Sequence, residues 1–178
     1  MPWRPMSSQD LAEVQVLADS IHVNHLEDAT VFVERLRLYP EGCYVLADGK
    51  RLLGYALTHP WRYGEPPPLN ALLGELPRDA STYYVHDVAL LPDARGQGHA
   101  AEIVAILAEH AGTAGFGNLS LVAVNGSQGF WERFGFRTAA IPGLDAKLLS
   151  YGPDAMLMAR DLAQAFGSAG GSASARNN

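Results

Sequence analysis

The sequence predicts a single domain in which helices cover a mixed α/β sheet. Apolar strand patterns alternate with helical patterns along most of the chain. The chain has 178 residues, of which 48% are hydrophobic and 18% charged. This length allows one complete hydrophobic core and is short for two. The dipeptide Asp48-Gly49 between two apolar runs is a strong hairpin signal and places two adjacent strands in the first half.

The first half is expected to begin with a strand and two helices. Apolar side chains recur at helical spacing after Ser7 or Ser8, either of which can cap the first helix. The elements expected here are a strand over 3–6, helices over about 8–21 and 31–38 with a break near 22–25, and strands over 43–47 and 52–58. The proline-rich stretch 60–80 is expected to be a long loop, and such loops are often functional.

The second half is expected to alternate strands with helices up to residue 160. The predicted strands cover 82–91, 119–124, 136–140 and 155–160, and the predicted helices cover about 98–112 and 128–133. We expect the domain to span residues 1–166. Residues 167–178 are Gly, Ser, Ala, Arg and Asn with little to bury, which predicts a flexible tail.

Charge and composition exclude several classes of function. The net charge of −6 argues against nucleic-acid binding and favours cationic partners. No basic-then-apolar leader is recognisable and no apolar run approaches the ~20 residues that span a bilayer, so we expect a cytoplasmic protein without a membrane partner. Cys43 is the only cysteine, which excludes an internal disulfide and a cysteine-rich metal site. A homodimer is compatible with the sequence.

The most informative segment is a glycine-bearing turn between the predicted strand 82–91 and the following helix. Gly96 and Gly98 lack Cβ atoms, so backbone N–H groups can approach an anion, and the start of the helix adds the positive end of its dipole. Arg95 supplies a neighbouring cation. No Gly-Lys-Ser/Thr follows, and the spacing is not that of the three-glycine dinucleotide fingerprint. The turn is therefore predicted to be a pyrophosphate cradle of another kind.

Two motifs in this region carry a resemblance to a known superfamily. The first is Arg95-x-x-Gly98-x-Ala100 directly after Val88-Ala89-Leu90-x-Pro92, and the second runs from Asn125 to Phe136. Together they resemble motifs A and B of the Gcn5-related (GNAT) acetyltransferases, over roughly residues 6–162. The resemblance implies a mixed, mostly antiparallel twisted sheet of six to seven strands flanked by about four helices. Its splayed strands would hold coenzyme A.

The resemblance also implies a set of residues that bind acetyl-coenzyme A as co-substrate. One N–H group of the strand 88–90 would stabilise the developing oxyanion. The implied cofactor-binding residues are Val88, Ala89, Leu90, Arg95, Gly96, Gln97, Gly98, His99, Ala100, Ala101, Asn125 and Trp131.

A narrower likeness concerns the proton acceptor. The segments Tyr84–Leu90 and Phe130–Phe136 are similar to arylalkylamine N-acetyltransferases, which carry histidines on the strand before motif A. His86 occupies one such position and Tyr84 replaces the other. His86 is the first choice of base because its unperturbed pKa of ~6.5 suits proton acceptance near neutrality. Strand alternation places His86 and Asp87 on opposite faces, so one of them would face the acceptor. A core-packing role for His86 stays open.

Trp131 departs from the superfamily pattern. That position usually holds a tyrosine placed to protonate the coenzyme A thiolate, whereas an indole N–H scarcely gives up its proton. We therefore interpret Trp131 as an aromatic side chain that packs at the cofactor edge within the catalytic region. Water, Ser127, Tyr83 or Tyr84 could supply the proton, or the thiolate could leave without one.

The acceptor is the part of the function that the sequence defines least. His22 and His25 are predicted to line its opening, and His59 with Trp61 to form an aromatic wall or, alternatively, to anchor the long loop. No carboxylate–histidine signature predicts a metal. The sequence favours direct transfer of an acetyl group to a primary amine of a small molecule. A coenzyme A-binding sensor that has lost catalysis and a protein N-terminal or lysine acetyltransferase are the alternatives.

Overall fold

The computed structural model describes residues 2–162, so the predicted tail 167–178 and the domain limit at 166 lie outside the described residues. Short 3-10 turns at Ser8–Asp10, Pro40–Gly42 and Pro92–Ala94 lead into longer elements. The helices are α1 (Leu11–Ile21), α2 (Ala29–Leu38), α3 (His99–Thr113), α4 (Gln128–Glu132) and α5 (Asp145–Leu149). The strands are β1 (Trp3–Pro5), β2 (Cys43–Asp48), β3 (Arg51–Trp61), β4 (Thr82–Leu90), β5 (Asn118–Ala123), β6 (Arg137–Thr138) and β7 (Met156–Asp161).

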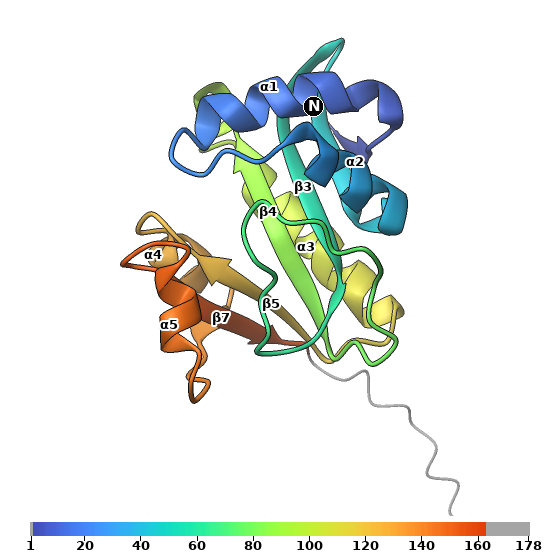
Figure 1. Cartoon of the computed structure of the whole chain (residues 1–178). Coiled ribbons are helices and arrows are strands. Elements are labelled where there is room, and N and C mark those ends of the chain that lie inside the picture. The colour runs from blue at the N-terminus through green and yellow to red at the C-terminus, as the bar shows by residue number, and fades with distance from the viewer. Residues whose placement is uncertain (1, 163–178) are drawn as a thin grey trace, which may run out of the picture.

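The strands form one mixed sheet in the order β1-β2-β3-β4-β5-β7-β6, in which only the β4–β5 pair is parallel among the described strands. This confirms the expected mixed, mostly antiparallel sheet of six to seven strands. Helices α1 and α2 cover one face, and α3 covers the other, as Figure 1 shows. Each face therefore has its own apolar cluster, one built around Phe32, Tyr55 and Leu57 and the other around Ile103, Leu107 and Leu121.

The observed elements differ from the predicted ones mainly near the C-terminal edge of the sheet. The expected strand 136–140 shortens to β6, because the chain turns away towards Pro142 and Gly143 after a last backbone bond from Ala139 to β7. Helix α5 was not predicted, since five residues between glycine- and proline-bearing turns give too short a periodic signal. Strand β3 runs on to Trp61, so the long loop covers residues 62–81.

Strand β4 contains an irregularity that overturns one prediction. Leu57 of β3 lies opposite Asp87, but the next residue, Thr58, lies opposite Val85, so His86 is an extra residue in β4, as in a β-bulge. A bulge breaks the alternation of faces. As a result, His86 and Asp87 line the same cavity on the α1–α2 face, and the prediction that only one of them faces it was wrong.

None of the helices in the described residues 2–162 combines the length and the hydropathy that crossing a bilayer requires.

Candidate active site

The first component of the site is an open cleft between β4 and β5. The two strands pair at Tyr83–Leu119 and Tyr84–Ser120 and then separate, which leaves a cleft of about 550 Å³. Residues Val85–Leu90 of β4 form one wall. The opposite wall includes Leu121, Val122 and the segment from Val124 to Trp131. The splayed strands implied by the sequence are thus present.

Backbone donors of β4 point into this cleft. Leu91 N–H donates to Leu53 O of β3 at 2.8 Å, so Leu91 faces β3. Backbone groups of successive residues in a regular strand point to opposite sides, which turns Val88 and Leu90 towards β5. The Leu90 carbonyl accepts a hydrogen bond from Arg95 Nε at 3.0 Å, so it is directed away from β3, in agreement with this orientation. Val88 and Leu90 N–H groups are therefore available to a bound acyl group.

The glycine turn lies at one end of the cleft and has the shape expected of an anion cradle. Gly96 has φ of 75° and Gly98, the N-cap of α3, has φ of 88°, a region that L side chains avoid. A Cβ built on either glycine would meet nothing within 4 Å, so a ligand can reach the backbone. The 15-residue helix α3 begins here and directs its first N–H groups outward.

The other predicted cofactor residues fall into two groups. Arg95, Asn125 and Trp131 line the cleft with Val88, Ala89 and Leu90. Gln97 belongs to the turn, and His99, Ala100 and Ala101 form the first turn of α3, where backbone N–H groups have no partner within the helix. The Gln97 side chain donates to Asp93 O at 2.6 Å, and His99 Nδ1 lies 3.4 Å from Glu102.

Trp131 is 7% exposed and packs edge-on against Phe130 and Phe136, with ring centroids 5.0 and 5.3 Å away. The Trp131 side chain is therefore packed into the wall of the cleft, which agrees with its interpretation as an aromatic packing residue.

The second component is a cavity of about 80 Å³ on the α1–α2 face of β4. It joins the cleft at five residues that line both spaces, namely His22, His86, Asp87, Val122 and Val124. Residues 67–69 of the long loop form its cover. A molecule in this cavity can thus reach an acyl group held in the cleft.

The cover is fastened to α2 by buried polar groups. Glu34 accepts hydrogen bonds from the N–H groups of Leu73 and Gly74 at 2.8–2.9 Å, and Arg35 donates to Ala71 O at 2.9 Å. Arg35 is almost fully buried, with Glu34 3.8 Å away. Tyr151 adds a hydrogen bond to Pro67 O from the other side. These anchors hold the loop over the cavity.

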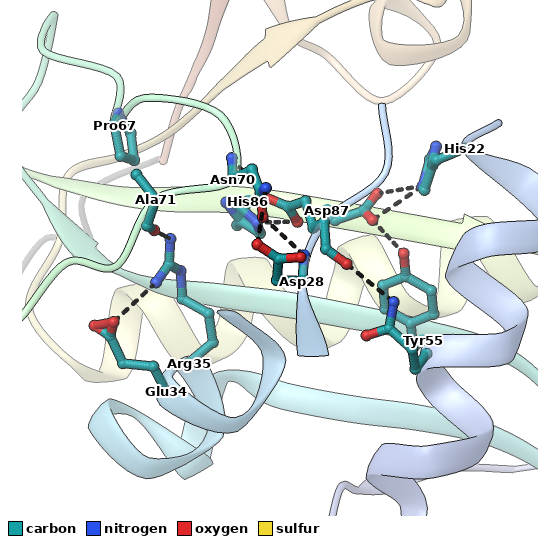
Figure 2. A network of polar contacts seen from close by, with 12 residues as sticks. His22, Asp28, Glu34, Arg35, Tyr55, Pro67, Asn70, Ala71, His86 and Asp87 are labelled. Carbon is teal, nitrogen blue, oxygen red and sulfur yellow. Dashed lines mark hydrogen bonds and ion pairs between the residues drawn. The ribbon is translucent and has the colours of Figure 1, made fainter. Parts of the chain in front are cut away.

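Asp87 is held by two donors at the junction of the cavity and the cleft, as Figure 2 shows. His22 Nε2 lies 3.0–3.1 Å from the Asp87 carboxylate, and Tyr55 donates to it as well. Burial disfavours both charges, but the mutual hydrogen bond and attraction outweigh it, so the pKa of His22 is raised and that of Asp87 is lowered. Burial and the charge of Asp87 raise the pKa of Tyr55, which keeps its proton.

A second histidine–carboxylate pair lies beside the first. His86 Nε2 is 2.9 Å from Glu27 Oε2, and the two side chains are 7% and 11% exposed. Burial favours the neutral acid, but the bond and charge of His86 outweigh it and lower the pKa of Glu27. Because a carboxylate only accepts, Nε2 carries a proton in this bond, and the neutral form of the ring would hold its lone pair on Nδ1. His86 therefore has a carboxylate partner, and the role of base predicted for it stays a prediction.

The remaining predicted residues divide between the cavity and its surroundings. Tyr84 and His25 line the cavity, and His25 Nε2 donates to Tyr151 O at 2.8 Å. Burial raises the pKa of Tyr84 well above 10 and makes it a weak acid. His59 and Trp61 lie outside the cavity lining that the structure describes.

Trp61 contacts the long loop, as the alternative prediction has it, whereas the His59 ring packs between Trp61 and Tyr84. The His59 and Trp61 rings meet edge-on at 5.5 Å, and Trp61 donates to Glu65 O at 2.8 Å. Burial lowers the pKa of His59 to about 3, so it stays neutral.

Three important side chains were not predicted from the sequence. Asp87 was assigned to the wrong face because the bulge at His86 is invisible in the pattern. In the sequence, Tyr55 lies in an apolar strand pattern and is therefore indistinguishable from an ordinary core residue. Glu27 lies 59 residues before His86 in the chain, and no local motif connects the two.

The split sheet has a glycine turn and the start of a helix beside the split, and a histidine–carboxylate pair at its edge. This arrangement is the one expected of a protein that binds an anionic carrier. The match to the family model "Acetyltransferase (GNAT) family" covers residues 10–136, well over half of the chain. The chain therefore belongs to the GNAT acetyltransferase family, whose members are acyltransferases that use coenzyme A. Curated protein sequences gave no match.

Solved structures share the fold at low sequence identity. N-acetylglutamate synthase from Neisseria gonorrhoeae, complexed with coenzyme A and N-acetyl-glutamate, superposes with a TM-score of 0.67 at 18% identity, over 91% of this chain and 35% of that one. Naa20 from Chaetomium thermophilum with a bisubstrate analogue gives 0.69 at 14% identity, over 92% and 88% of the two chains. The GphF GNAT-like decarboxylase with isobutyryl-CoA gives 0.72 at 15%, over 92% and 100%.

Proposed function

We propose that this protein transfers the acetyl group of acetyl-coenzyme A directly to a primary amine of a small molecule. The observation that carries the proposal is the junction of two spaces, an open cleft with an anion cradle and a covered cavity with acidic walls, at His86 and Asp87. Among the described residues that line the cavity, Asp19, Glu27 and Asp87 are acidic and none is lysine or arginine. Such a cavity attracts a cation of limited size.

The residues of the cleft fit acetyl-coenzyme A. Gly96 and Gly98 leave open space in front of backbone donors for the pyrophosphate, and Arg95 adds a positive charge at the same end. Val88 and Leu90 offer N–H groups along the wall, where the pantetheine and the acyl oxygen would lie. When bound, acetyl-coenzyme A supplies an activated thioester.

The protein's own groups would then prepare the amine and stabilise the reaction. The acidic wall attracts the ammonium ion, and His86 Nδ1 takes its proton while Glu27 holds the ring and stabilises the imidazolium. The free amine nitrogen forms a bond to the acyl carbon, and the carbon–sulfur bond breaks. Val88 or Leu90 N–H stabilises the negative charge that develops on the acyl oxygen. The bonded nitrogen then loses a second proton, which passes through water to the departing sulfur, and the proton held on His86 is released to solvent.

A coenzyme A-binding sensor is the second candidate, and Trp131 is the observation that favours it. Its buried, edge-packed indole stands where the family usually has an acidic hydroxyl. Loss of that hydroxyl would leave binding intact and remove one route of protonation.

Thiol release from acetyl-coenzyme A in the presence of a panel of amines, amino acids, aminoglycosides and peptides distinguishes the candidates. We expect release with at least one small primary amine and formation of the matching N-acetyl product by mass spectrometry. Tight binding of acetyl-coenzyme A without release on any amine would refute the transferase proposal and support the sensor. Release with peptides alone would assign the protein to the protein acetyltransferases.

A further inference from the structure

The structure argues against the two tyrosines that the sequence offers as proton donors to the departing sulfur. Tyr83 is fully buried, and its hydroxyl is bonded to Thr58 Oγ1 at 2.6 Å. Tyr84 lines the acceptor cavity but does not line the cleft, where the thioester would lie. Burial raises the pKa of both tyrosines well above 10. Trp131 lines the cleft in the place of the family's tyrosine, and its indole scarcely gives up a proton.

Two histidines are the remaining groups of the cleft that can exchange a proton near neutral pH. Histidine is the side chain whose unperturbed pKa lies there, and the described lining of the cleft contains His22 and His86. Asp87 in the same lining is ionised, Arg95 keeps its proton, and a serine hydroxyl such as that of Ser127 does not titrate in this range.

The partners of the two histidines place them on different sides of the junction. His86 is bonded to Glu27, which lines the acceptor cavity and does not line the cleft. His22 is bonded to Asp87, which lines both spaces, and its neighbour Ile21 lines the cleft. The amine would approach from the cavity and the sulfur would leave into the cleft, so His86 is suited to the amine and His22 to the sulfur.

One ring nitrogen of His22 is available at the junction. Nε2 donates to the Asp87 carboxylate at 3.0–3.1 Å (Figure 2). Nδ1 is bonded to no group among the described residues and is not one of their fully buried polar atoms, so a ligand can reach it. The His22 side chain is 26% exposed, compared with 7% for His86. When the ring is protonated, Nδ1 therefore carries a proton that is bound to no protein acceptor.

The charges around His22 favour the protonated ring. Burial opposes the charge, but the hydrogen bond and charge of Asp87, together with the charge of Glu27, outweigh it and raise the pKa of His22. Asp87 is itself held ionised by His22 and Tyr55. The other titratable or charged groups that line the two spaces are Asp19, His25, Tyr84, His86, Arg95 and Tyr151. His22 thus has a proton to give at neutral pH.

We infer that His22 is the general acid of this site and gives its Nδ1 proton to the departing sulfur. The inference rests on the proposed function and adds a catalytic residue to it. As the carbon–sulfur bond breaks, its electron pair stays on sulfur, which forms a new bond to the proton of His22. The second proton that the amine nitrogen loses then passes through water to His22 and restores the protonated ring. His86 still holds the first proton and releases it to solvent.

The pH dependence of single-turnover thiol release tests this role. The measurement uses a saturating amine between about pH 5.5 and about pH 9, below the pKa of about 10.4 that is typical of alkylammonium groups. Wild type should show a bell-shaped profile, because the base must be neutral and the acid protonated. His22→Gln should lower the rate near neutral pH by about 10² and lose the decline on the alkaline side, while acetyl-coenzyme A affinity stays unchanged.

His110→Gln is the matched control for this measurement. His110 is also hydrogen-bonded, with Nε2 2.8 Å from the Tyr39 hydroxyl, and it lies outside the described lining of both spaces. This variant should keep the rate and the alkaline decline of wild type. An alkaline decline that persists in His22→Gln, with thiol still released, would overturn the inference and leave the proposed function standing.

Ultraviolet absorbance of the thiolate of bound coenzyme A tests the same contact without turnover. A protonated ring beside the sulfur favours the thiolate, so the apparent pKa of the bound thiol should be lower by about one unit or more in wild type and His86→Gln than in His22→Gln. The titration is run above about pH 7, where the bond of His22 to Asp87 contributes least to stability, and His22→Asn serves as a second variant if His22→Gln does not fold. If no amine is acetylated but this difference is found, the transferase proposal fails and the placement of His22 at the sulfur stands. An equal pKa of the bound thiol in wild type and the His22 variants would overturn the inference whether or not the protein is active.

Discussion

Replacement of Gly98 by aspartate should abolish binding of acetyl-coenzyme A while leaving the fold intact. Gly98 is the N-cap of α3 with φ of 88°, and a Cβ at this position meets nothing within 4 Å. The new side chain therefore clashes with no protein atom and extends into the space where the pyrophosphate is expected. It blocks close approach to the backbone and places a negative charge there.

The expected loss can be worked out from these two effects. A positive φ costs a non-glycine residue about 1–2 kcal/mol, which lowers the free energy of unfolding without unfolding the protein. A carboxylate at about 5 Å from one phosphate charge, with an effective dielectric constant of about 20, adds roughly 3 kcal/mol of repulsion. That corresponds to about a hundredfold weaker binding for each phosphate charge, before the loss of backbone contacts is counted.

Gly115→Asp is a control matched to the same backbone geometry. Gly115 also has φ of 88°, also has nothing within 4 Å of a built Cβ, and follows the opposite end of α3. The 15-residue helix separates the two positions by about 22 Å. Both variants should lose similar thermal stability, whereas calorimetry should show weakened acetyl-coenzyme A binding for Gly98→Asp alone. Equal affinity of the two folded variants would refute the cradle assignment.

Three further predictions concern the junction and the cleft wall. His86→Gln should lower turnover by about 10² with little change in cofactor affinity, and a pH–rate profile identical to wild type would return His86 to a packing role. The bond between His22 and Asp87 should stabilise the fold by about 1.5–3 kcal/mol when both are charged. Because folding raises the pKa of His22, the bond stabilises the fold fully at pH values below about 6.5, the pKa of histidine in the unfolded chain. The lowered pKa of Asp87 keeps that carboxylate ionised down to acid pH, so the stabilisation persists there. The difference in unfolding free energy between wild type and His22→Gln should therefore be largest near pH 5–6 and shrink as the pH rises through the pKa of His22 in the folded protein. Urea titrations at pH 5.5 and 8.5 measure it, and a difference that grows with pH would contradict the assignment. Trp131→Tyr should retain or modestly raise single-turnover thiol release, whereas a collapse of turnover at unchanged cofactor affinity would show that the indole does more than pack.

The cofactor half of the site could be predicted from sequence because its parts are local. Gly96, Gly98 and the start of α3 follow one another directly, and the positive φ values of the turn require the glycines themselves, so a short motif contains nearly all of the information. The strands on both sides of it were also predictable, since each carries a continuous apolar run. Helix α5 and the shortness of β6 were not predicted, because short elements at the edge of a fold depend on contacts with their neighbours rather than on their own periodicity.

The acceptor half could not be predicted to the same depth, because its geometry depends on contacts between distant segments. The pairing of His86 with Glu27 and of Asp87 with His22 brings the segment after α1 onto β4. The insertion of His86 into β4 as a bulge changes which face Asp87 occupies, and nothing in an apolar strand pattern shows where a bulge will form. Pattern reasoning therefore found the histidine and misjudged the carboxylate beside it.

The charge of the acceptor cavity explains why two histidines are held there. Ionised Glu27 and Asp87 attract an ammonium ion, but the same charges stabilise its protonated form and so oppose the attack that needs a free amine. An acidic cavity alone would bind the acceptor and keep it unreactive. Bonding each carboxylate to a histidine supplies a proton acceptor within the same field, and protonation of that histidine neutralises the charge that held the ammonium proton in place. In the proposed reaction, the pairing of His86 with Glu27 would combine attraction of the amine with its deprotonation. The hydrogen bonds of Asp87 with His22 and Tyr55 keep the second carboxylate ionised and partnered.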